Sequence, residues 1–391
     1  MQKPSLLSCF FFVFFIPQLS FSCPQDQRQS LLEFKNLLTH NIKNGSITDQ
    51  ALRDLETWKP NSDCCKWQLV RYDALSPSRE VTDLNLTYLV RSDSGSVSSS
   101  ILRPVLRISS LVTLYVSRNS IEGKIPGDAF VNLTRLISLD MRLNNFNGSI
   151  PTELCSLKTL QRLDLSRNAI GGTLNGDIKE LKNLQELVLV GNLIGGAIPP
   201  EIGSLVELRV LSMSWNKFNG SIPLSVSQLT KLETFDLQSN SLSFEIPNGI
   251  GNLVNLSTLS FSMNKLSGGI PSSIQNLKYL QSLTLNGNKD LSGEIPTWLF
   301  GLQNLRILRF GGNKLQWNSN GSVFAQSKLY ELSLRACGLE GNIPDWLKNL
   351  TALVYLDLSM KKLQGSFPKW LADLKIARII IRQQTIGLIA S

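Results

Sequence analysis

The amino-acid sequence predicts an α/β repeat solenoid, in which short parallel strands line the concave face of a right-handed superhelix. Two observations carry this prediction. An asparagine recurs every 24 residues, with two steps of 25, and leucines precede it in the fixed pattern LxxLxLxxN. The middle of that pattern alternates with the period of a β-strand, and Ile-Pro pairs such as Ile125-Pro126 and Ile222-Pro223 follow it.

The repeat continues through eleven successive positions. Nine of them hold asparagine: Asn119, Asn144, Asn168, Asn192, Asn216, Asn240, Asn264, Asn288 and Asn313. The next two hold Cys337 and Lys361. We expect each asparagine to point inward at a turn, where its amide bonds backbone groups that have no other partner. Lysine is hard to bury, so we expect the coil of Lys361 to be loose.

Each part of the repeat has a physical role. A single strand cannot bury its leucine face, so coils must stack and share one apolar core. Proline lacks the N–H that would continue pairing, so the Ile-Pro pair ends a second short extended segment. Eleven strands at a spacing of about 4.8 Å give an inner face roughly 50 Å long.

Residues 1–22 have the features of a secretory signal peptide. Lys3 is followed by an apolar stretch from Leu6 to Leu19, and Ser20 and Ser22 are small residues suited to a cleavage site. The stretch is too short for a spanning helix. We therefore expect secretion, with Cys23 at the mature N-terminus.

Eight N-x-S/T sequons agree with export, because this sequence is the acceptor of N-linked glycans. They are Asn44, Asn85, Asn132, Asn147, Asn219, Asn255, Asn320 and Asn349. Asn85 differs from the others that we place in loops, because it falls on a predicted strand.

The full repeat, LxxLxxLxLxxNxLxGxIPxx, resembles that of plant extracellular leucine-rich-repeat proteins. Before it come Cys23, a helical SLLEFKNLL segment, Trp58 and the sequence DCCKW, and this combination is similar to the receptor-like proteins. The resemblance covers residues 1 to about 375. It implies an N-terminal leucine-rich-repeat cap at 23–80 and repeats at 81–375, about eleven regular ones and a degenerate first repeat.

The resemblance also implies a pattern of disulfides in the cap. Cys23 would pair with Cys64, and Cys65 would pair with a cysteine seven positions later. That position is Tyr72 in this sequence. We therefore expect Cys65 to lack a partner and the cap to be weakened. Cys155 and Cys337 have no motif of catalytic or metal-binding cysteines near them, so we interpret both as structural.

Residues 376–391 form an aberrant, uncapped tail in this interpretation. Ile376, Ile379 and Ile381 begin another strand one residue out of register, and no apolar span follows. Family members usually continue through further repeats, a C-terminal cap, a membrane helix and a short tail without a kinase. We therefore expect a shortened form, which would be anchored at the plasma membrane only if a longer product carries the anchor.

Catalysis is not indicated. The chain has one histidine, His40, and no Ser-His-Asp, HExxH or phosphate-loop motif, so we expect no enzyme activity, cofactor or metal site. Four aspartates share one strand column and are interpreted as solvated strand residues: Asp140, Asp164, Asp236 and Asp357. The net charge of +9 is diffuse, which does not favour nucleic-acid binding.

A ligand would bind on the concave face, where the residues two, four and six positions before each asparagine point away from the core. Aromatic and arginine side chains carry most contact energy in interfaces, so they rank first. Tyr115, Arg142, Arg162 and Asp164 form one predicted cluster, and Arg309, Arg335 and Tyr355 form another. Between these two clusters lie two further candidates, Trp215 and Gln238.

The function predicted first is that of a ligand-binding ectodomain of a plant receptor-like protein. It would sense a peptide or a microbial or wall-derived pattern, with a peptide, protein or oligosaccharide as ligand and a co-receptor kinase as signalling partner. One alternative is a secreted inhibitor of a cell-wall hydrolase, similar to the polygalacturonase-inhibiting proteins. Another is a structural wall-associated repeat protein.

Overall fold

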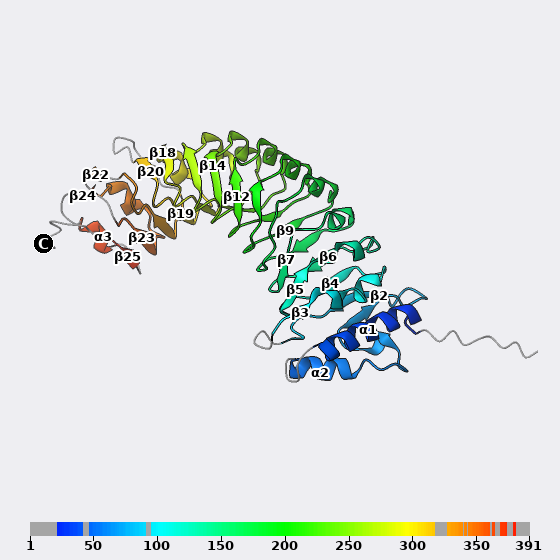
Figure 1. The fold of residues 1–391 in the computed structure, drawn as a ribbon. Coiled ribbons are helices and arrows are strands. Elements are labelled where there is room, and N and C mark those ends of the chain that lie inside the picture. The colour runs from blue at the N-terminus through cyan, green and yellow to red at the C-terminus, as the bar shows by residue number, and fades with distance from the viewer. Residues whose placement is uncertain are drawn as a thin grey trace, which may run out of the picture.

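The computed structural model describes residues 22–41, 47–90, 95–316, 327–338, 340–341, 343–359, 362–363, 368–373 and 378–380. The chain winds through successive coils along an arc, with its N-terminal helices at one end (Figure 1). The predicted solenoid is thus confirmed. The predictions for residues 1–21, for Asn44, Asn320 and Lys361 and for most of 376–391 fall outside the described residues.

A sheet of fourteen strands runs along the arc, and all its pairs are parallel except that of β1 with β2. Its strands follow one another in chain order: β1 (Val70–Tyr72), β2 (Val81–Asn85), β4 (Thr113–Tyr115), β6 (Ser138–Asp140), β8 (Arg162–Asp164), β9 (Glu186–Val188), β11 (Val210–Ser212), β13 (Thr234–Asp236), β15 (Thr258–Ser260), β17 (Ser282–Thr284), β19 (Ile307–Arg309), β21 (Glu331–Ser333), β23 (Tyr355–Asp357) and β25 (Arg378–Ile380).

The central residue of each repeat strand is a core residue. Leu163, Leu187 and Leu211 pair across three neighbouring strands, and each is at most 1% exposed. Their neighbours on either side in the strand face solvent, as the alternation predicts. The last pair departs from the repeat, because Leu356 lies opposite Ile379, 23 positions later, whereas most steps are 24. This one-residue shift is the one that the isoleucine pattern predicts.

Second short strands follow the asparagines and form smaller parallel sheets. The largest holds β10 (Gly195–Ala197), β12 (Lys217–Gly220), β14 (Ser241–Glu245), β16 (Lys265–Gly268), β18 (Asp290–Glu294) and β20 (Lys314–Gln316). The other two hold β3 (Val97–Ser98), β5 (Ile121–Lys124) and β7 (Asn145–Asn147), and β22 (Glu340–Gly341) with β24 (Lys362–Leu363).

Short 3₁₀ helices complete each coil on the outer side of the arc (Figure 1). Most begin directly after the proline of the Ile-Pro pair, as at Pro247, which N-caps the turn Asn248–Asn252. The others are Ser99–Leu102, Val105–Arg107, Gly127–Ala129, Thr152–Ser156, Gly176–Glu180, Pro200–Ser204, Leu224–Gln228, Ser272–Asn276, Thr297–Gly301 and Asp345–Asn349. Proline therefore ends most of the second extended segments, as the sequence predicts, whereas Asn175 N-caps the turn Gly176–Glu180.

The recurring asparagines join neighbouring coils. Asn264 donates from Nδ2 to the carbonyls of Phe261 in its own coil and Leu237 in the preceding coil, at 3.1 and 2.9 Å, and its Oδ1 accepts from Leu242 N at 3.0 Å. Cys337 occupies the same position and donates from Sγ to the Phe310 carbonyl at 3.2 Å. The inward asparagine that the sequence predicts is confirmed.

The residue directly before each of these positions has a left-handed backbone. Trp215 has φ 56° and Met263 has φ 57°, whereas Gly191 and Gly287 occupy the equivalent place with φ 68° and 76°. An L side chain is disfavoured in this conformation, and glycine is not. The backbone before each of these positions thus has the same conformation whether the preceding residue is glycine or a residue with a side chain.

The N-terminal cap consists of α1 (Gln25–Asn41), α2 (Asp49–Glu56) and a 3₁₀ turn at Cys64–Lys66. Trp58 is fully buried and stacks on Trp67 with ring centroids 5.4 Å apart. Gln27 joins the cap to the first coils, because its Oε1 accepts from Val81 N at 2.7 Å and its Nε2 donates to Ser110 Oγ at 3.0 Å. β1 of the cap and β2 of the first repeat belong to the same sheet. The cap boundary at residue 80 therefore stays a prediction.

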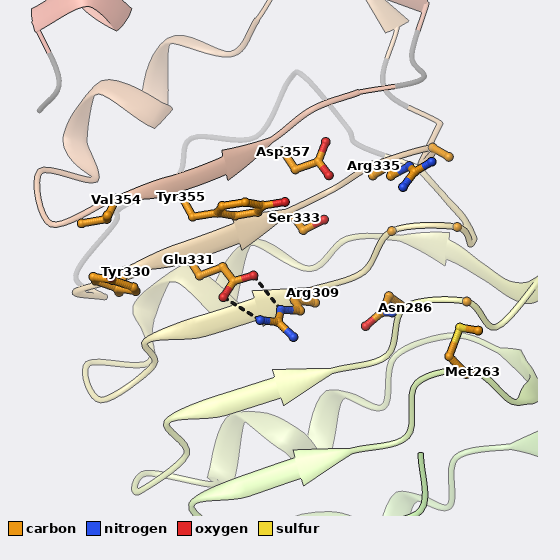
Figure 2. A pocket seen from close by; sticks show the side chains of 14 residues that line it. Met263, Asn286, Arg309, Tyr330, Glu331, Ser333, Arg335, Val354, Tyr355 and Asp357 are labelled. Carbon is orange, nitrogen blue, oxygen red and sulfur yellow. Dashed lines mark hydrogen bonds and ion pairs between the residues drawn. The ribbon is translucent and has the colours of Figure 1, made fainter. Parts of the chain in front are cut away.

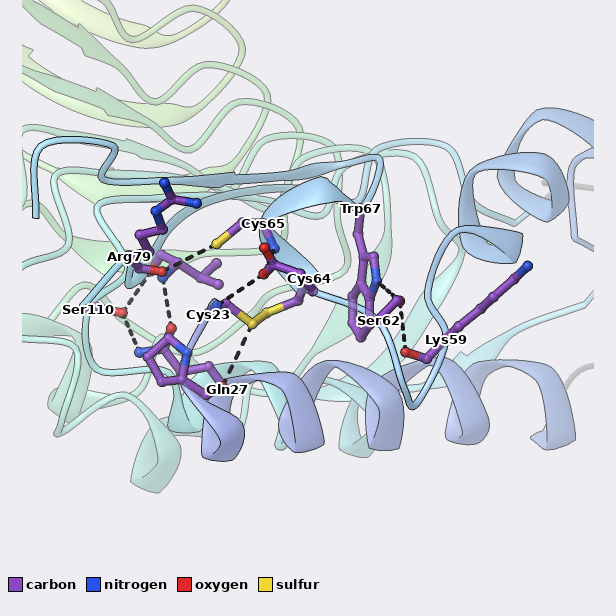
Figure 3. The surroundings of a disulfide bond; sticks show 12 residues. Cys23, Gln27, Lys59, Ser62, Cys64, Cys65, Trp67, Arg79 and Ser110 are labelled. Carbon is purple, nitrogen blue, oxygen red and sulfur yellow. Dashed lines mark hydrogen bonds between the residues drawn. A yellow bond between two sulfur atoms is a disulfide. The ribbon is translucent and has the colours of Figure 1, made fainter. Parts of the chain in front are cut away.

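The disulfide expected in the cap is present. Cys23 and Cys64 are bonded, with Cα atoms 5.7 Å apart, and tie the start of α1 to the 3₁₀ turn (Figure 3). Asp63 adds to this junction, because its Oδ1 accepts from the backbone N of Cys23 at 3.0 Å and of Cys65 at 3.1 Å. The residues directly before α1 are thereby fixed to the cap.

Cys65 has no disulfide partner among the residues that the structure describes. Its Sγ donates to the Arg79 carbonyl at 3.6 Å (Figure 3). Tyr72, at the position where related caps carry a cysteine, lies under the Arg79 guanidinium at 5.6 Å from its ring centroid. Cys155, which the sequence places on the outer side of its coil, lies in the turn Thr152–Ser156 but is buried, 6% exposed.

Cys65 is expected to react slowly with alkylating reagents. Burial, together with the neighbouring Asp63 carboxylate, raises the pKa of the Cys65 thiol to about 11. Only the thiolate reacts, so at about pH 8 alkylation by iodoacetamide is expected to be more than about a hundredfold slower than for an ordinary thiol. The rate should rise about tenfold per pH unit up to pH 11. Peptide mapping of labelled Cys65 measures it, and a native intrachain disulfide at Cys65 would contradict the expectation.

Candidate ligand-binding face

The concave face is built by the strand residues on either side of each buried leucine. Tyr115, Asp140 and Asp164 pair in register on neighbouring strands β4, β6 and β8. Strand spacing places such neighbours about 4.8 Å apart, so residues from successive coils form continuous columns. The two predicted clusters line two separate pockets of this face, one toward each end of the arc.

The C-terminal pocket is lined by residues in and next to β19, β21 and β23 and by residues that follow β15 and β17. It has a volume of about 760 Å³ and contains all three residues predicted for the second cluster, which are Arg309, Arg335 and Tyr355. Figure 2 shows these side chains with the others that line the pocket. The three residues that the sequence groups together therefore lie in one pocket, and their role in binding stays a prediction.

An internal ion pair occupies the middle of this pocket. Arg309 donates from Nε to Glu331 Oε1 at 2.6 Å and from Nη2 to Glu331 Oε2 at 2.8 Å (Figure 2). The bond to Glu331 raises the pKa of the Arg309 guanidinium. Glu331 is only 14% exposed, whereas Arg309 is 46% exposed. A bidentate pair of this kind fixes the guanidinium plane and leaves its outer edge open to solvent.

Aromatic and sulfur-containing side chains border the same pocket. Tyr330 is 54% exposed and Met263 is 56% exposed, on opposite sides of the Arg309 pair (Figure 2). Asp357 is only 6% exposed, and its Oδ1 accepts from Ser359 N at 2.9 Å. The expectation that Asp357 is a solvated strand residue is therefore wrong, because its side chain is buried and bonded to the backbone of Ser359.

The N-terminal pocket lies over β2, β4, β6 and β8 and has a volume of about 560 Å³. All four residues predicted for the first cluster line it, and the structure adds further residues. The predicted residues are Tyr115, Arg142, Arg162 and Asp164. The added ones include Asn85, Asp140 and Glu186.

Ion pairs organise this pocket as well. Arg142 lies between two carboxylates, with Nε 3.3 Å from Asp140 Oδ2 and Nη1 3.5 Å from Asp164 Oδ2. Arg162 Nε lies 3.1 Å from Glu186 Oε1. Burial raises the pKa of the Asp140 carboxyl above its usual value, and nearby Asp164 adds to this effect while Arg142 opposes it. Both arginines of this pocket thus already form ion pairs with acidic side chains of the same chain.

Trp215 and Gln238 are not among the residues lining either pocket. Trp215 is 61% exposed in the bend between β11 and β12, and Gln238 Oε1 accepts from Ser260 Oγ at 3.4 Å. The sequence reasoning missed Glu331 and Tyr330. Glu331 lies one coil after Arg309, in the outward-facing column six positions before Cys337. The signal that could have identified it is an outward arginine followed by an outward acid in the next coil.

Six of the eight sequon asparagines lie in the described residues, and all six are exposed. Five of them lie outside the main sheet: Asn132, Asn147, Asn219, Asn255 and Asn349. Asn85 is the last residue of β2, on the strand where the sequence places it, and it lines the N-terminal pocket.

The described residues contain no group of three or more His, Cys, Asp or Glu side chains arranged to hold a metal ion. Within the same ranges, no helix has the length and apolar character needed to cross a membrane. His40 is exposed, and its Nδ1 lies 2.8 Å from the Asn36 carbonyl of the preceding helical turn.

Three family models match the sequence. The leucine-rich repeat region matches residues 176–381, the leucine rich repeat matches 109–170, and the leucine rich repeat N-terminal domain matches 24–71. Receptor-like protein 46 of Arabidopsis thaliana is 72% identical over 384 residues, which are 97% of this chain and 47% of that protein. The chain therefore spans about half the length of this relative.

Solved structures with the same fold include receptor ectodomains. The crystal structure of PEPR1-AtPEP1 superposes with a TM-score of 0.70 at 28% identity, over 91% of this chain and 55% of that one. The ectodomain of the plant membrane receptor kinase GASSHO1/SCHENGEN3 from Arabidopsis thaliana, in complex with CASPARIAN STRIP INTEGRITY FACTOR 2, superposes with a TM-score of 0.69 at 26% identity. That match covers 90% of this chain and 47% of the other.

Proposed function

Because the chain belongs to the leucine-rich-repeat receptor-like proteins of plants, we propose that it is a ligand-binding ectodomain whose ligand binds in the C-terminal pocket. The ligand is an extracellular peptide or a microbial or wall-derived molecule, and the signal passes through a partner kinase. The protein acts outside the cell, in the apoplast or at the plasma membrane. The chain spans 47% of its relative, so these statements concern the part in hand.

The observation that carries this proposal is the composition of the C-terminal pocket. Arg309, Arg335, Tyr330 and Tyr355 converge on one hollow of about 760 Å³. Arginine and tyrosine are the residue types in which binding energy concentrates, particularly where a concave surface removes them from water. These residues come from three successive coils, so only the folded solenoid brings them together.

The charge of the pocket favours a peptide over an acidic polymer. Arg309 is neutralised by Glu331, and Asp357 adds a buried acid beside Arg335. The same pairing recurs on the rest of the solenoid, for example between Arg209 and Glu233 at 2.7 Å. A binder of polyanions would need rows of unpaired basic groups, and acid–base pairs of both signs instead match a ligand that carries polar groups of both kinds.

Replacing both pocket arginines is expected to abolish most ligand binding. The double variant Arg309→Ala, Arg335→Ala loses two interface anchors, so retention of the ligand should fall at least about tenfold. The measurement is capture of partners from plant wall and membrane extract on the immobilised chain. A membrane kinase among proteins captured by the wild type but not by the variant supports reception.

The matched control is Arg103→Ala, which removes an exposed arginine from its pair with Asp128, 2.8 Å away in the neighbouring coil. It changes charge outside both pockets and should leave capture unchanged. Thermal unfolding of each variant checks that the fold is retained. Equal capture by the wild type and the double variant would refute the pocket assignment, and capture of a cell-wall hydrolase alone would favour the inhibitor function.

A further inference from the structure

Asn85 is placed differently from the other described sequon asparagines. It ends strand β2 and lies opposite Tyr115 of β4, in the column that continues through Asp140 and Asp164. Its side chain is exposed and lines the N-terminal pocket. A group attached to Asn85 would therefore project onto the concave face itself, whereas the other five lie outside the main sheet.

The local geometry leaves the attachment atom accessible. Asn85 Oδ1 accepts from the backbone N of Thr87 at 3.3 Å, which holds the side chain in a short turn. No hydrogen bond within the described part of the chain uses Asn85 Nδ2. Leu86, the middle residue of the sequon, is 1% exposed and anchors the turn in the core. By contrast, the Nδ2 of Asn255 donates to the Thr230 carbonyl at 2.9 Å.

We propose that Asn85 carries an N-linked glycan that fills the N-terminal pocket and leaves the C-terminal pocket as the open ligand site. In the transfer, the anomeric carbon of a lipid-pyrophosphate-linked oligosaccharide bonds to Asn85 Nδ2. Its bond to the pyrophosphate oxygen breaks, and the amide nitrogen loses one proton. The choice of ligand site rests on the proposed function, whereas the glycan itself does not.

The place of Asn85 in a strand does not oppose modification. Transfer takes place on the extended chain during export, and the folded protein then has only to accommodate the product. A bulky, hydrated glycan needs a solvent-facing side chain and open space in front of it. Asn85 has both, because the concave face in front of β2 is hollow. The strand that makes Asn85 unusual as a sequon therefore also directs its side chain to the pocket.

The glycan covers the residues that a ligand would need at this end. Tyr115 lies one strand from Asn85 and Asp140 lies two strands away, so they are about 5 and 10 Å from it across the sheet. Arg142 is paired to Asp140 and lies within the same pocket. A peptide that lay along these columns would collide with the first sugars. No residue that lines the C-terminal pocket is a sequon asparagine.

The first experiment maps glycosylation on the chain secreted from plant cells. Glycopeptide mass spectrometry is expected to find Asn85 occupied. The variant Thr87→Ser keeps the N-x-S/T acceptor and should stay occupied, whereas Thr87→Ala and Asn85→Gln remove it and should lose one glycan. An unmodified Asn85 in a secreted chain that carries glycans at Asn147 and Asn219 would overturn the proposal.

The second experiment tests whether the glycan covers the pocket, with phenylglyoxal as an arginine probe. Arg142 and Arg162 have side chains 50% and 60% exposed in the bare chain. They should react severalfold faster in Asn85→Gln than in the glycosylated protein. Arg309 is the internal control, because it is 46% exposed and ion-paired on the same face, and its rate should not change. Equal rates for Arg142 and Arg162 in both proteins would show that the pocket stays open.

Neither experiment uses the ligand, so the outcomes separate the two proposals. A glycan at Asn85 with no effect of the Arg309 and Arg335 substitutions on capture would refute the proposed function and leave the glycan in place. An unmodified Asn85 with capture lost in the double variant would refute the glycan and support the proposed function.

Discussion

Replacing Asn288 with alanine is expected to lower the free energy of unfolding of the surrounding coils by about 3 kcal/mol or more. Asn288 is fully buried. Its Nδ2 donates to the carbonyls of Phe261 and Leu285 at 3.0 and 2.8 Å, and its Oδ1 accepts from Leu266 N at 3.1 Å. Alanine offers no partner to these three backbone groups, and each buried group that loses its partner costs about 1–3 kcal/mol.

Chemical denaturation and amide hydrogen exchange of the two coils that flank Asn288 measure this loss. Asn288→Cys should fall between the wild type and Asn288→Ala, because a thiol can donate one hydrogen bond, as Cys337 does to Phe310. Asn145→Ala is the surface control, since Asn145 is exposed beside another asparagine of the series, and it should change stability by less than about 0.5 kcal/mol. A destabilisation of that small size in Asn288→Ala would contradict the structural role of the series.

Removing the cap disulfide is expected to destabilise the cap by about 4 kcal/mol. Cys23 and Cys64 are 41 positions apart, and chain-entropy estimates for a loop of that length give about 4 kcal/mol. In Cys23→Ala, Cys64→Ala, the amides of α1 should exchange up to about a thousandfold faster. Coils beyond Leu237 should keep their protection, because solenoid coils contact only their neighbours.

Cys65→Ala is the matched control for this experiment. It removes a neighbouring cysteine of the same cap that forms no disulfide within the described residues, so α1 should stay protected. Unchanged exchange of α1 in the double variant would mean that Trp58, Trp67 and the Gln27 contacts hold the cap without the disulfide. The same loss of protection in Cys65→Ala would contradict the assignment of the staple to Cys23 and Cys64.

The fold was predictable because the same pattern of leucines and asparagine recurs in successive coils. Most coils place a leucine in the strand and an asparagine at the turn, so an exception such as Phe235 or Cys337 does not obscure the pattern. The single disulfide was implied by resemblance to related caps, and Tyr72 marked the missing second one. The sequence pattern does not show whether neighbouring residues bury an outward-facing side chain. Asp357 occupies the same position in the repeat as Asp140, yet it is only 6% exposed and accepts a hydrogen bond from Ser359 N.

The candidate site was predictable in membership but not in pairing. Column positions gave Arg309, Arg335 and Tyr355, because strand geometry dictates which residues face outward. The partner of Arg309 depends on which rotamer spans two strands, and Glu331 supplies that partner at 2.6 Å. Trp215 was ranked with these residues by residue type alone, but it lies in the bend between β11 and β12 and lines neither pocket.

The left-handed residue before each asparagine has a consequence for how this surface can vary. Glycine fits that conformation at Gly191 and Gly287, whereas Trp215 and Met263 hold it against a preference of about 1–2 kcal/mol. Such side chains project at the rim and do not belong to the leucine spine. The residue type at these rim positions can therefore vary during evolution, from glycine to tryptophan, without a change in how the coils stack.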